Sequence, residues 1–151
     1  MEIIIREMEE PDFADVTSLW QNELGFSHVT SESIAATYAK MRQNDCYKTF
    51  VAIEDDGTGD SAAVIGFITT VEVMAVGYPV GYMKINGLAV KKEYRGMGIG
   101  RKLIEHIEQI AKENGISRIG LATGFQRKEA HAFYERLGYK SGSYWYGKNL
   151  K

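Results

Sequence analysis

Three glycines stand close together in the stretch from Tyr94 to Arg101, between an apolar run that ends at Val90 and a long amphipathic segment. A turn that lacks side chains lets successive backbone N–H groups converge on phosphate oxygens. A helix after the turn adds its own unpaired N–H groups and the positive end of its dipole. The stretch therefore predicts a site for a phosphate-rich ligand.

Two other glycine-rich loops use the same physics, and neither fits. A Walker loop ends in Gly-Lys-Ser/Thr, whereas Gly100 is followed by Arg101, Lys102 and Leu103, which offer no hydroxyl for Mg²⁺. A dinucleotide-binding loop has the spacing Gly-x-Gly-x-x-Gly and an acidic residue about 20 positions later. Here the spacing is Gly-x-Gly-x-Gly, and the next apolar run ends at Thr123 without a carboxylate. The sequence thus argues against a nucleotide triphosphatase and against a dinucleotide-dependent enzyme.

Arg95, Gly98 and Gly100 fit the pattern Arg-x-x-Gly-x-Gly, which resembles the acetyl-CoA signature of the GNAT family of N-acetyltransferases. Residues 85–90 (INGLAV) resemble the family's fourth strand, and residues 130–139 (AHAFYERLGY) resemble its second signature helix and closing strand. Together these motifs span roughly the C-terminal half of the chain. The resemblance implies an α/β (α+β) acyl-CoA N-acyltransferase fold in one domain of residues 1–151. Its central sheet would be mixed, flanked by helices, with the fourth and fifth strands splayed apart.

The resemblance also implies where the coenzyme binds. The pyrophosphate would be held chiefly by main-chain N–H groups of Arg95, Gly96, Met97, Gly98, Ile99, Gly100 and Arg101. The pantetheine arm would pair with the backbone of Leu88, Ala89 and Val90 as an added strand would. Asn86-Gly87 is consistent with a β-bulge that opens the sheet beside them.

Two cations follow the last glycine of the motif. Arg101 and Lys102 oppose the dipole in the first turn of the expected helix, and an anionic ligand would offset that cost. Solvated surface charges are the alternative for each.

Tyr134 is the implied general acid, because the family places a tyrosine in this Phe-Tyr-Glu context with its hydroxyl near the coenzyme sulfur. Packing in the core is the alternative. Many relatives carry a glutamate base on the fourth strand, where this chain has Asn86. The candidate bases are then Glu72, acting through water, and His28, reaching in from the first helix pair, and a structural or solvated role is the alternative for each. Arg127 stands where relatives often carry an asparagine that contacts the coenzyme, and it would either meet a phosphate or remain solvated.

The family builds its acceptor pocket from the first helix pair and the loop near the last strands, which here are rich in aromatic residues. The residues concerned are Trp20, Phe26, His28, Tyr38, Tyr144, Trp145 and Tyr146. Such a set could stack on a flat or cationic acceptor, bury itself, or form a homodimer interface.

Composition argues against several other classes of protein. The chain has 151 residues, 44% hydrophobic and 25% charged, and no apolar run approaches the ~20 residues that cross a bilayer. The N-terminus lacks a basic leader, so a cytoplasmic location is expected. A lone Cys46 and scattered histidines at 28, 106 and 131 predict no disulfide and no metal site. A net charge of −2 argues against a nucleic-acid partner.

Hydrophobic periodicity predicts ten elements. Strands are expected at 3–5, 48–54, 62–74, 82–90 and 116–123, and a final strand or hairpin at 139–149. Helices are expected at 12–24, from 31 to about 41 with Ser31 as the cap, from 99 to a stop at Asn114-Gly115, and at 128–137. The turns near Gly57 and Gly77 indicate an antiparallel meander.

The combined interpretation is an enzyme that moves the acetyl group of acetyl-CoA directly to a primary amine, without a covalent enzyme intermediate. A small-molecule acceptor is expected first, and a protein or peptide amine second. The alternative from another class is a sensor that binds acyl-CoA and catalyses nothing.

Overall fold

The computed structural model describes residues 2–57 and 62–150. Its strands are β1 (Glu2–Glu7), β2 (Tyr47–Asp55), β3 (Val64–Val73), β4 (Tyr82–Val90) and β5 (Ile119–Leu121). Its helices are α1 (Phe13–Asn22), α2 (Ser31–Met41), α3 (Ile99–Glu113) and α4 (Lys128–Arg136), with short 3₁₀ turns η1 (Glu10–Asp12) and η2 (Lys92–Tyr94). The chain forms two compact units, residues 1–120 and 121–151.

The first unit is built on a sheet in the strand order β1-β2-β3-β4-β5. Strands β1 to β4 pair antiparallel with their neighbours, whereas β5 runs parallel to β4 after the α3 crossover. The antiparallel meander, the mixed sheet and the α+β class are therefore confirmed. Strand β5 is shorter than the predicted 116–123.

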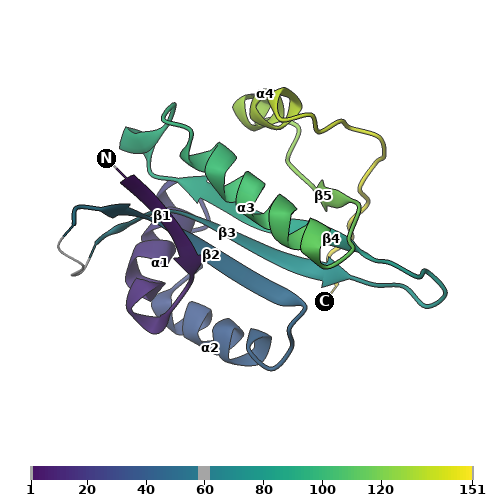
Figure 1. Ribbon diagram of the computed structural model, residues 1–151, viewed down its shortest axis with the longest axis horizontal. Coiled ribbons are helices and arrows are strands. Elements are labelled where there is room, and N and C mark those ends of the chain that lie inside the picture. The colour runs from purple at the N-terminus through teal and green to yellow at the C-terminus, as the bar shows by residue number, and fades with distance from the viewer. Residues whose placement is uncertain (1, 58–61, 151) are drawn as a thin grey trace. The chain divides into compact units, whose positions relative to one another are not determined.

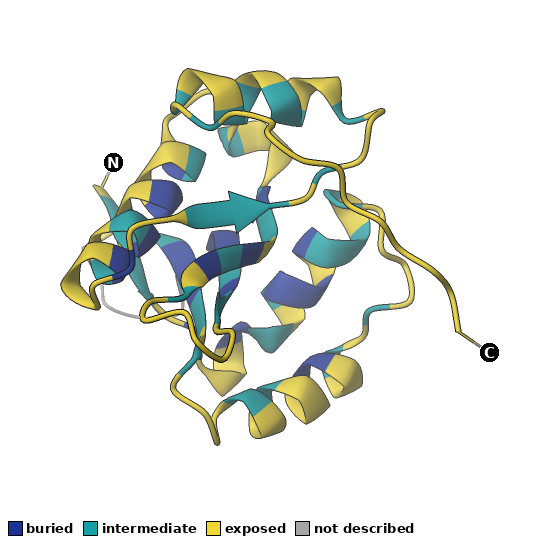
Figure 2. Cartoon of the chain, turned by 90° about the vertical axis from the view of Figure 1, so that its right-hand side faces the viewer, coloured by how far each residue is buried: buried dark blue, intermediate teal, exposed yellow. Residues whose placement is uncertain are grey.

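Helices cover both faces of this sheet (Figure 1). One face packs under α1 and α2, over a buried cluster that includes Val16, Leu19, Ile34, Val51 and Phe67. The other face lies under α3, whose inward residues Ile99, Leu103, Ile104, Ile107 and Ala111 are at most 2% exposed. Burial of one such leucine or isoleucine side chain contributes about 1.5–3 kcal/mol. The sheet thus separates two apolar layers, and Figure 2 shows dark-blue buried positions along α3 and the strands.

The helix ends follow local chemistry. Thr30 caps α2: its hydroxyl accepts from the Ser33 N–H at 3.0 Å, and the Ser33 hydroxyl accepts from the Thr30 N–H at 2.9 Å. The predicted cap, Ser31, is wrong by one position because this reciprocal pair needs a spacing of three residues. Gly115, with φ of 74°, follows α3 and confirms the predicted stop.

The second unit contains α4 and an extended tail. The final strand or hairpin predicted at 139–149 is wrong, because residues 137–150 form neither helix nor strand. Tyr144, Trp145 and Tyr146 are 81%, 73% and 88% exposed. Aromatic residues favour strands by packing against neighbouring strands, so the preference has no effect where no such neighbour is present. The tail is coloured almost entirely as exposed in Figure 2.

Candidate active site

The glycine stretch forms the turn between η2 and α3. Gly96 and Gly98 have φ of 79° and 81°, in the left-handed region that a side chain disfavours. A Cβ at either position would meet nothing within 4 Å. The glycines are therefore required by backbone conformation and not by crowding within the chain.

The first turn of α3 presents N–H groups without partners in the helix. Gly98 is the N-cap and supplies no side-chain hydrogen bond. The first helical bond runs from the Lys102 N–H to the Gly98 carbonyl at 3.0 Å, so the N–H groups of Ile99, Gly100 and Arg101 lie ahead of the ladder. The Ile99 side chain is only 1% exposed and anchors this turn in the core. This arrangement suits an anion, and we call residues 95–101 the coenzyme cradle after the ligand that the sequence predicts for them.

The charged residues of the cradle have partners within the chain. The Arg95 N–H donates to the Lys92 carbonyl at 3.2 Å, and its guanidinium lies 3.2 Å from Glu23. Arg101 forms a 3.9 Å pair with Glu105 one turn along α3. Met97 is 50% exposed. Arg95 therefore braces the turn, while the unshared N–H groups come from the residues after it.

Strand β4 (9 residues) pairs with β3 along one edge, whereas β5 (3 residues) covers only part of the other edge, which leaves a free stretch there. The Lys91 N–H donates to the Ile65 carbonyl at 2.7 Å, so Lys91 and Ile65 form a hydrogen-bonded pair of the antiparallel strands. Because such pairs alternate in an antiparallel ladder, Ala89 faces β3 while the N–H and C=O groups of Leu88 and Val90 point to the opposite edge. The residue before β5 bonds near the start of β4, where the Met83 N–H donates to the Arg118 carbonyl at 3.0 Å.

The predicted bulge is present in β4. Thr69 pairs with Gly87 and Thr70 with Ile85, so Asn86 is the extra residue. A Cβ on Gly87 would lie 2.6 Å from the Trp20 indole. Gly87 thus lets α1 approach the strand at the bulge.

Tyr134 lies in α4, in the second unit. Its ring contacts Phe133 and Tyr139 edge to face, with centroids 5.1 and 5.9 Å apart. Burial raises the pKa of Tyr134 to about 12, an effect that the charge of Arg127 partly opposes. The hydroxyl is therefore protonated throughout the neutral range, as a proton donor requires.

The base candidates are not brought together. His28 is exposed, as is Asn86, which stands where relatives carry the glutamate. Glu72 pairs with Met83 on the face of the sheet that α3 covers. Gly87 lies on the opposite face, against α1. His28 lies at one end of an aromatic wall, which is Trp20, Phe26 and His28 with successive ring centroids 5.6 and 5.9 Å apart.

The structure also places the other candidate residues, Tyr38, Arg127 and Lys102. Tyr38, expected near the acceptor, packs edge to face on Phe13 and lies 3.3 Å from the Met8 carbonyl, so it belongs to the core. Arg127 is the N-cap of α4, and Lys102 is exposed. Within residues 2–57 and 62–150, there is no cluster of three or more His, Cys, Asp or Glu that could hold a metal, and no helix is long and apolar enough to cross a membrane.

Comparison with known proteins places these features in context. Residues 13–139 match the Acetyltransferase (GNAT) family. The D-amino-acid N-acetyltransferase of Saccharomyces cerevisiae is 28% identical over 149 residues, 97% of this chain and 91% of that protein. N-alpha-acetyltransferase 30 of Schizosaccharomyces pombe is 42% identical over 59 residues, 39% of this chain and 38% of that protein. In several curated relatives the match spans only about two fifths of their length.

Solved structures share the fold. A transcriptional regulator from Bacillus halodurans C-125 superposes with a TM-score of 0.86 at 23% identity, covering 99% of this chain and 100% of that one. Glucosamine-6-phosphate N-acetyltransferase from Arabidopsis thaliana superposes with a TM-score of 0.80 at 19% identity, covering all of both chains.

Proposed function

Because the chain belongs to the GNAT family of N-acetyltransferases, we propose that it transfers the acetyl group of acetyl-CoA directly to a primary amine of a small molecule. The acetyltransferase activity and the use of acetyl-CoA are those of the family. The acceptor class and the role of each residue are parts of the proposal. We also propose that residues 1–151 act as one acetyltransferase domain, since the family match crosses the boundary at residue 120.

The start of α3 is the observation that carries the proposal. A left-handed Gly98 leads into N–H groups that no side chain caps, which is a fit for a pyrophosphate. The assigned residues are Arg95, Gly96, Met97, Gly98, Ile99, Gly100 and Arg101. The outward groups of Leu88 and Val90 would pair with the amides of the pantetheine arm, and Ala89 would hold the strand to β3 between them.

Acetyl-CoA supplies an activated acetyl group as a thioester. The neutral amine of the acceptor forms the new C–N bond, the C–S bond breaks, and the departing sulfur takes the proton of the Tyr134 hydroxyl. The amine must lose a proton as it becomes an amide, and the tyrosinate regains one from solvent. A hydroxyl with a pKa of about 12 keeps its proton until the thiolate develops.

A small acceptor is favoured by two observations. The full-length relative is named for D-amino acids, which are small amines. The aromatic wall of Trp20, Phe26 and His28 begins against Gly87, at the bulge before the free edge of β4. Its rings could stack on a flat or cationic amine.

The proton of the amine has two proposed routes. Glu72 and Gly87 lie on opposite faces of the sheet, which makes His28 or a chain of water molecules the better candidate. His28 belongs to the aromatic wall, where its ring lies edge to face on Phe26 with the centroids 5.9 Å apart, and an imidazole nitrogen can accept a proton.

A protein or peptide amine is the second candidate acceptor, favoured by the match to N-alpha-acetyltransferase 30. The exposed Tyr144, Trp145 and Tyr146 would suit a peptide or a second copy of the chain. A cytoplasmic location would suit the coenzyme and the free, half-buried Cys46.

A thiol-release screen tests the proposal. Purified protein and acetyl-CoA are incubated with D- and L-amino acids, polyamines, aminoglycosides and peptides with free N-termini. Release with a small amine supports the proposal, and release with peptides alone favours the second candidate. Tight CoA binding without release across the panel would indicate the acyl-CoA sensor instead.

A further inference from the structure

Glu23 connects the end of α1 to the turn ahead of the coenzyme cradle. One carboxylate oxygen accepts from the Lys92 N–H at 3.0 Å, and the other accepts from the Arg95 guanidinium at 3.2 Å. The Glu23 side chain is only 12% exposed, whereas the Arg95 side chain is 50% exposed. A single side chain thus holds the turn at both of its ends.

A second carboxylate holds the last residue of η2. The Tyr94 hydroxyl donates to Glu54 of β2 at 2.8 Å. The turn η2 contains no buried residue. Hydrogen bonds and the ion pair, rather than apolar packing, therefore fix its position.

The position of the cradle depends on η2. Within residues 2–57 and 62–150, the contacts made by η2 and Arg95 are the ones that hold the chain between the end of β4 and the start of α3. On one side, the Lys91 N–H is bonded to β3. On the other side, Ile99 is the next buried side chain. Between them, Gly96 and Gly98 have no side chains, and a Cβ at either would touch nothing. Movement of η2 would therefore change the directions of the N–H groups that follow.

We propose that Glu23 is a positioning residue for the coenzyme: by binding the Lys92 N–H and Arg95, it fixes the backbone geometry in which the cradle meets the pyrophosphate. The inference rests on the proposed function, since it assumes that the cradle binds CoA. Glu23 would act through Lys92 and Arg95 rather than by touching the ligand. A carboxylate near a phosphate site would by itself repel the ligand, but pairing with Arg95 cancels that charge locally.

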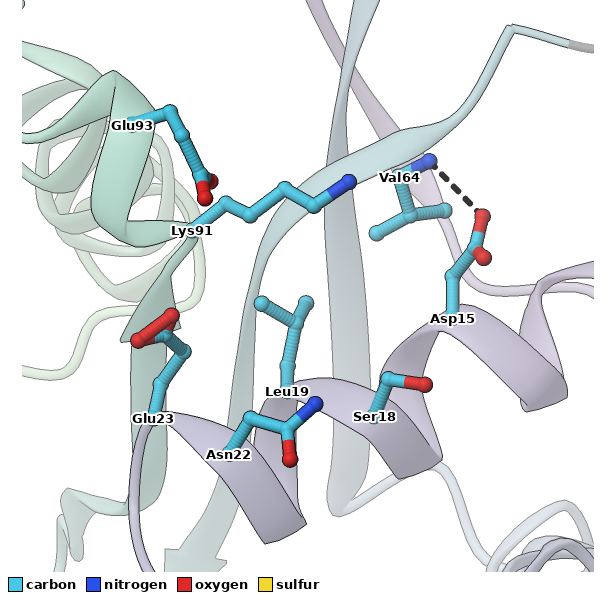
Figure 3. A pocket seen from close by; sticks show the side chains of 8 residues that line it. All are labelled: Asp15, Ser18, Leu19, Asn22, Glu23, Val64, Lys91 and Glu93. Carbon is cyan, nitrogen blue, oxygen red and sulfur yellow. Dashed lines mark hydrogen bonds between the residues drawn. The ribbon is translucent and has the colours of Figure 1, made fainter.

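Asp15 provides a matched control on the same helix. Glu23 and Asp15 line one hollow of about 310 Å³, at opposite ends of α1 (Figure 3). The Asp15 carboxylate also accepts from a backbone N–H, that of Val64 at 3.0 Å. This contact holds the start of β3 and makes no bond to η2. Asp15→Asn thus removes a comparable charge from the same hollow without loosening the cradle.

The test measures CoA affinity by calorimetry for wild type, Glu23→Gln, Glu23→Ala and Asp15→Asn. Glutamine keeps an oxygen for the Lys92 N–H but loses the ion pair, whereas alanine loses both contacts. We expect the Kd for CoA to rise about 3- to 10-fold for the glutamine variant and further for the alanine variant, with Asp15→Asn unchanged. Hydrogen exchange should quicken at residues 91–98 in the Glu23 variants while α3 beyond Leu103 stays protected.

Each outcome has a distinct meaning. The graded loss of CoA affinity, with the acceptor KM and kcat kept once an acceptor is known, supports the positioning role. Wild-type affinity in both Glu23 variants would overturn it. Tighter binding would also overturn it, because Glu23 would then be withholding Arg95 from the phosphates. If wild type itself does not bind CoA, the proposed function fails first.

Discussion

In the coenzyme cradle the groups assigned to the ligand are main-chain amides, whereas in the second unit the assigned group is one side-chain hydroxyl, that of Tyr134. The cradle is fixed by left-handed glycines, a buried Ile99 and carboxylates that come from distant parts of the chain. Tyr134 is fixed by a nine-residue helix and two ring contacts.

This difference determines how each region should respond to substitution. A main-chain site depends on conformation, so it fails when a glycine gains a side chain and tolerates changes in many neighbouring side chains. A side-chain site fails when one oxygen is removed and tolerates changes that keep the ring in place. Substitutions in the cradle should therefore change mainly the affinity for CoA, whereas substitution of Tyr134 should change mainly the turnover rate.

Removal of the Tyr134 hydroxyl should have the largest effect. We expect Tyr134→Phe to lower kcat about 10- to 1,000-fold, the range for loss of one proton-transfer group, and to leave CoA affinity unchanged. Steady-state kinetics together with calorimetry measure both quantities. Tyr139→Phe, in the same ring cluster, is the control and should retain turnover. Equal turnover in the wild type and Tyr134→Phe would remove Tyr134 from the mechanism.

Substitution of Gly98 should affect binding next most strongly. Alanine in the left-handed region costs about 1–2 kcal/mol, so we expect Gly98→Ala to weaken CoA binding about tenfold. Gly115→Ala is the matched control, because Gly115 also has a positive φ with no atom near its Cβ and lies at the other end of α3. A similar change in affinity for both variants would show that the effect comes from helix stability.

Disruption of the contact between Gly87 and Trp20 should lower the stability of the fold and weaken binding of the acceptor amine. A methyl group on Gly87 must displace the indole, so Gly87→Ala should lower the free energy of unfolding by about 1–3 kcal/mol. The acceptor KM should rise more than the CoA Kd. Denaturant unfolding and kinetics measure these effects, and an unaltered acceptor KM would place the acceptor away from the aromatic wall.

A smaller effect concerns alkaline pH. The pKa of Tyr134 is raised to about 12 from its ordinary 10, so the unfolded chain releases this proton first. The stabilisation is present below pH 10 and is lost as the pH rises towards 12. The free energy of unfolding should thus fall more steeply between about pH 10 and about pH 12 for wild type than for Tyr134→Phe. Parallel curves would show that burial does not perturb this hydroxyl.

The sequence predicted the features that local chemistry determines. The cradle glycines and the bulge at Asn86-Gly87 were readable because each depends on a few adjacent residues. The antiparallel meander was predictable from the apolar periodicity of the strands and from the turn residues near Gly57 and Gly77. The family match also agrees with the predicted resemblance.

The features that the sequence did not predict depend on distant partners. Glu23 lies 69 and 72 positions from the groups it holds, and nothing near it in the sequence marks a bond to η2. Burial was one of the interpretations that the sequence left open for Tyr38, but its packing partner Phe13, on another helix, could not be read from the sequence. The strand expected at 139–149 had the right residue types, yet a strand also needs a neighbouring edge.

Amide hydrogen exchange with and without CoA is the most direct measurement of the central claim, which is that main-chain N–H groups after Gly98 hold the pyrophosphate. The account predicts that CoA slows exchange most strongly at residues 96–101, and that Gly98→Ala weakens this protection while Tyr134→Phe keeps it. Binding of CoA with no added protection at these amides would contradict the account.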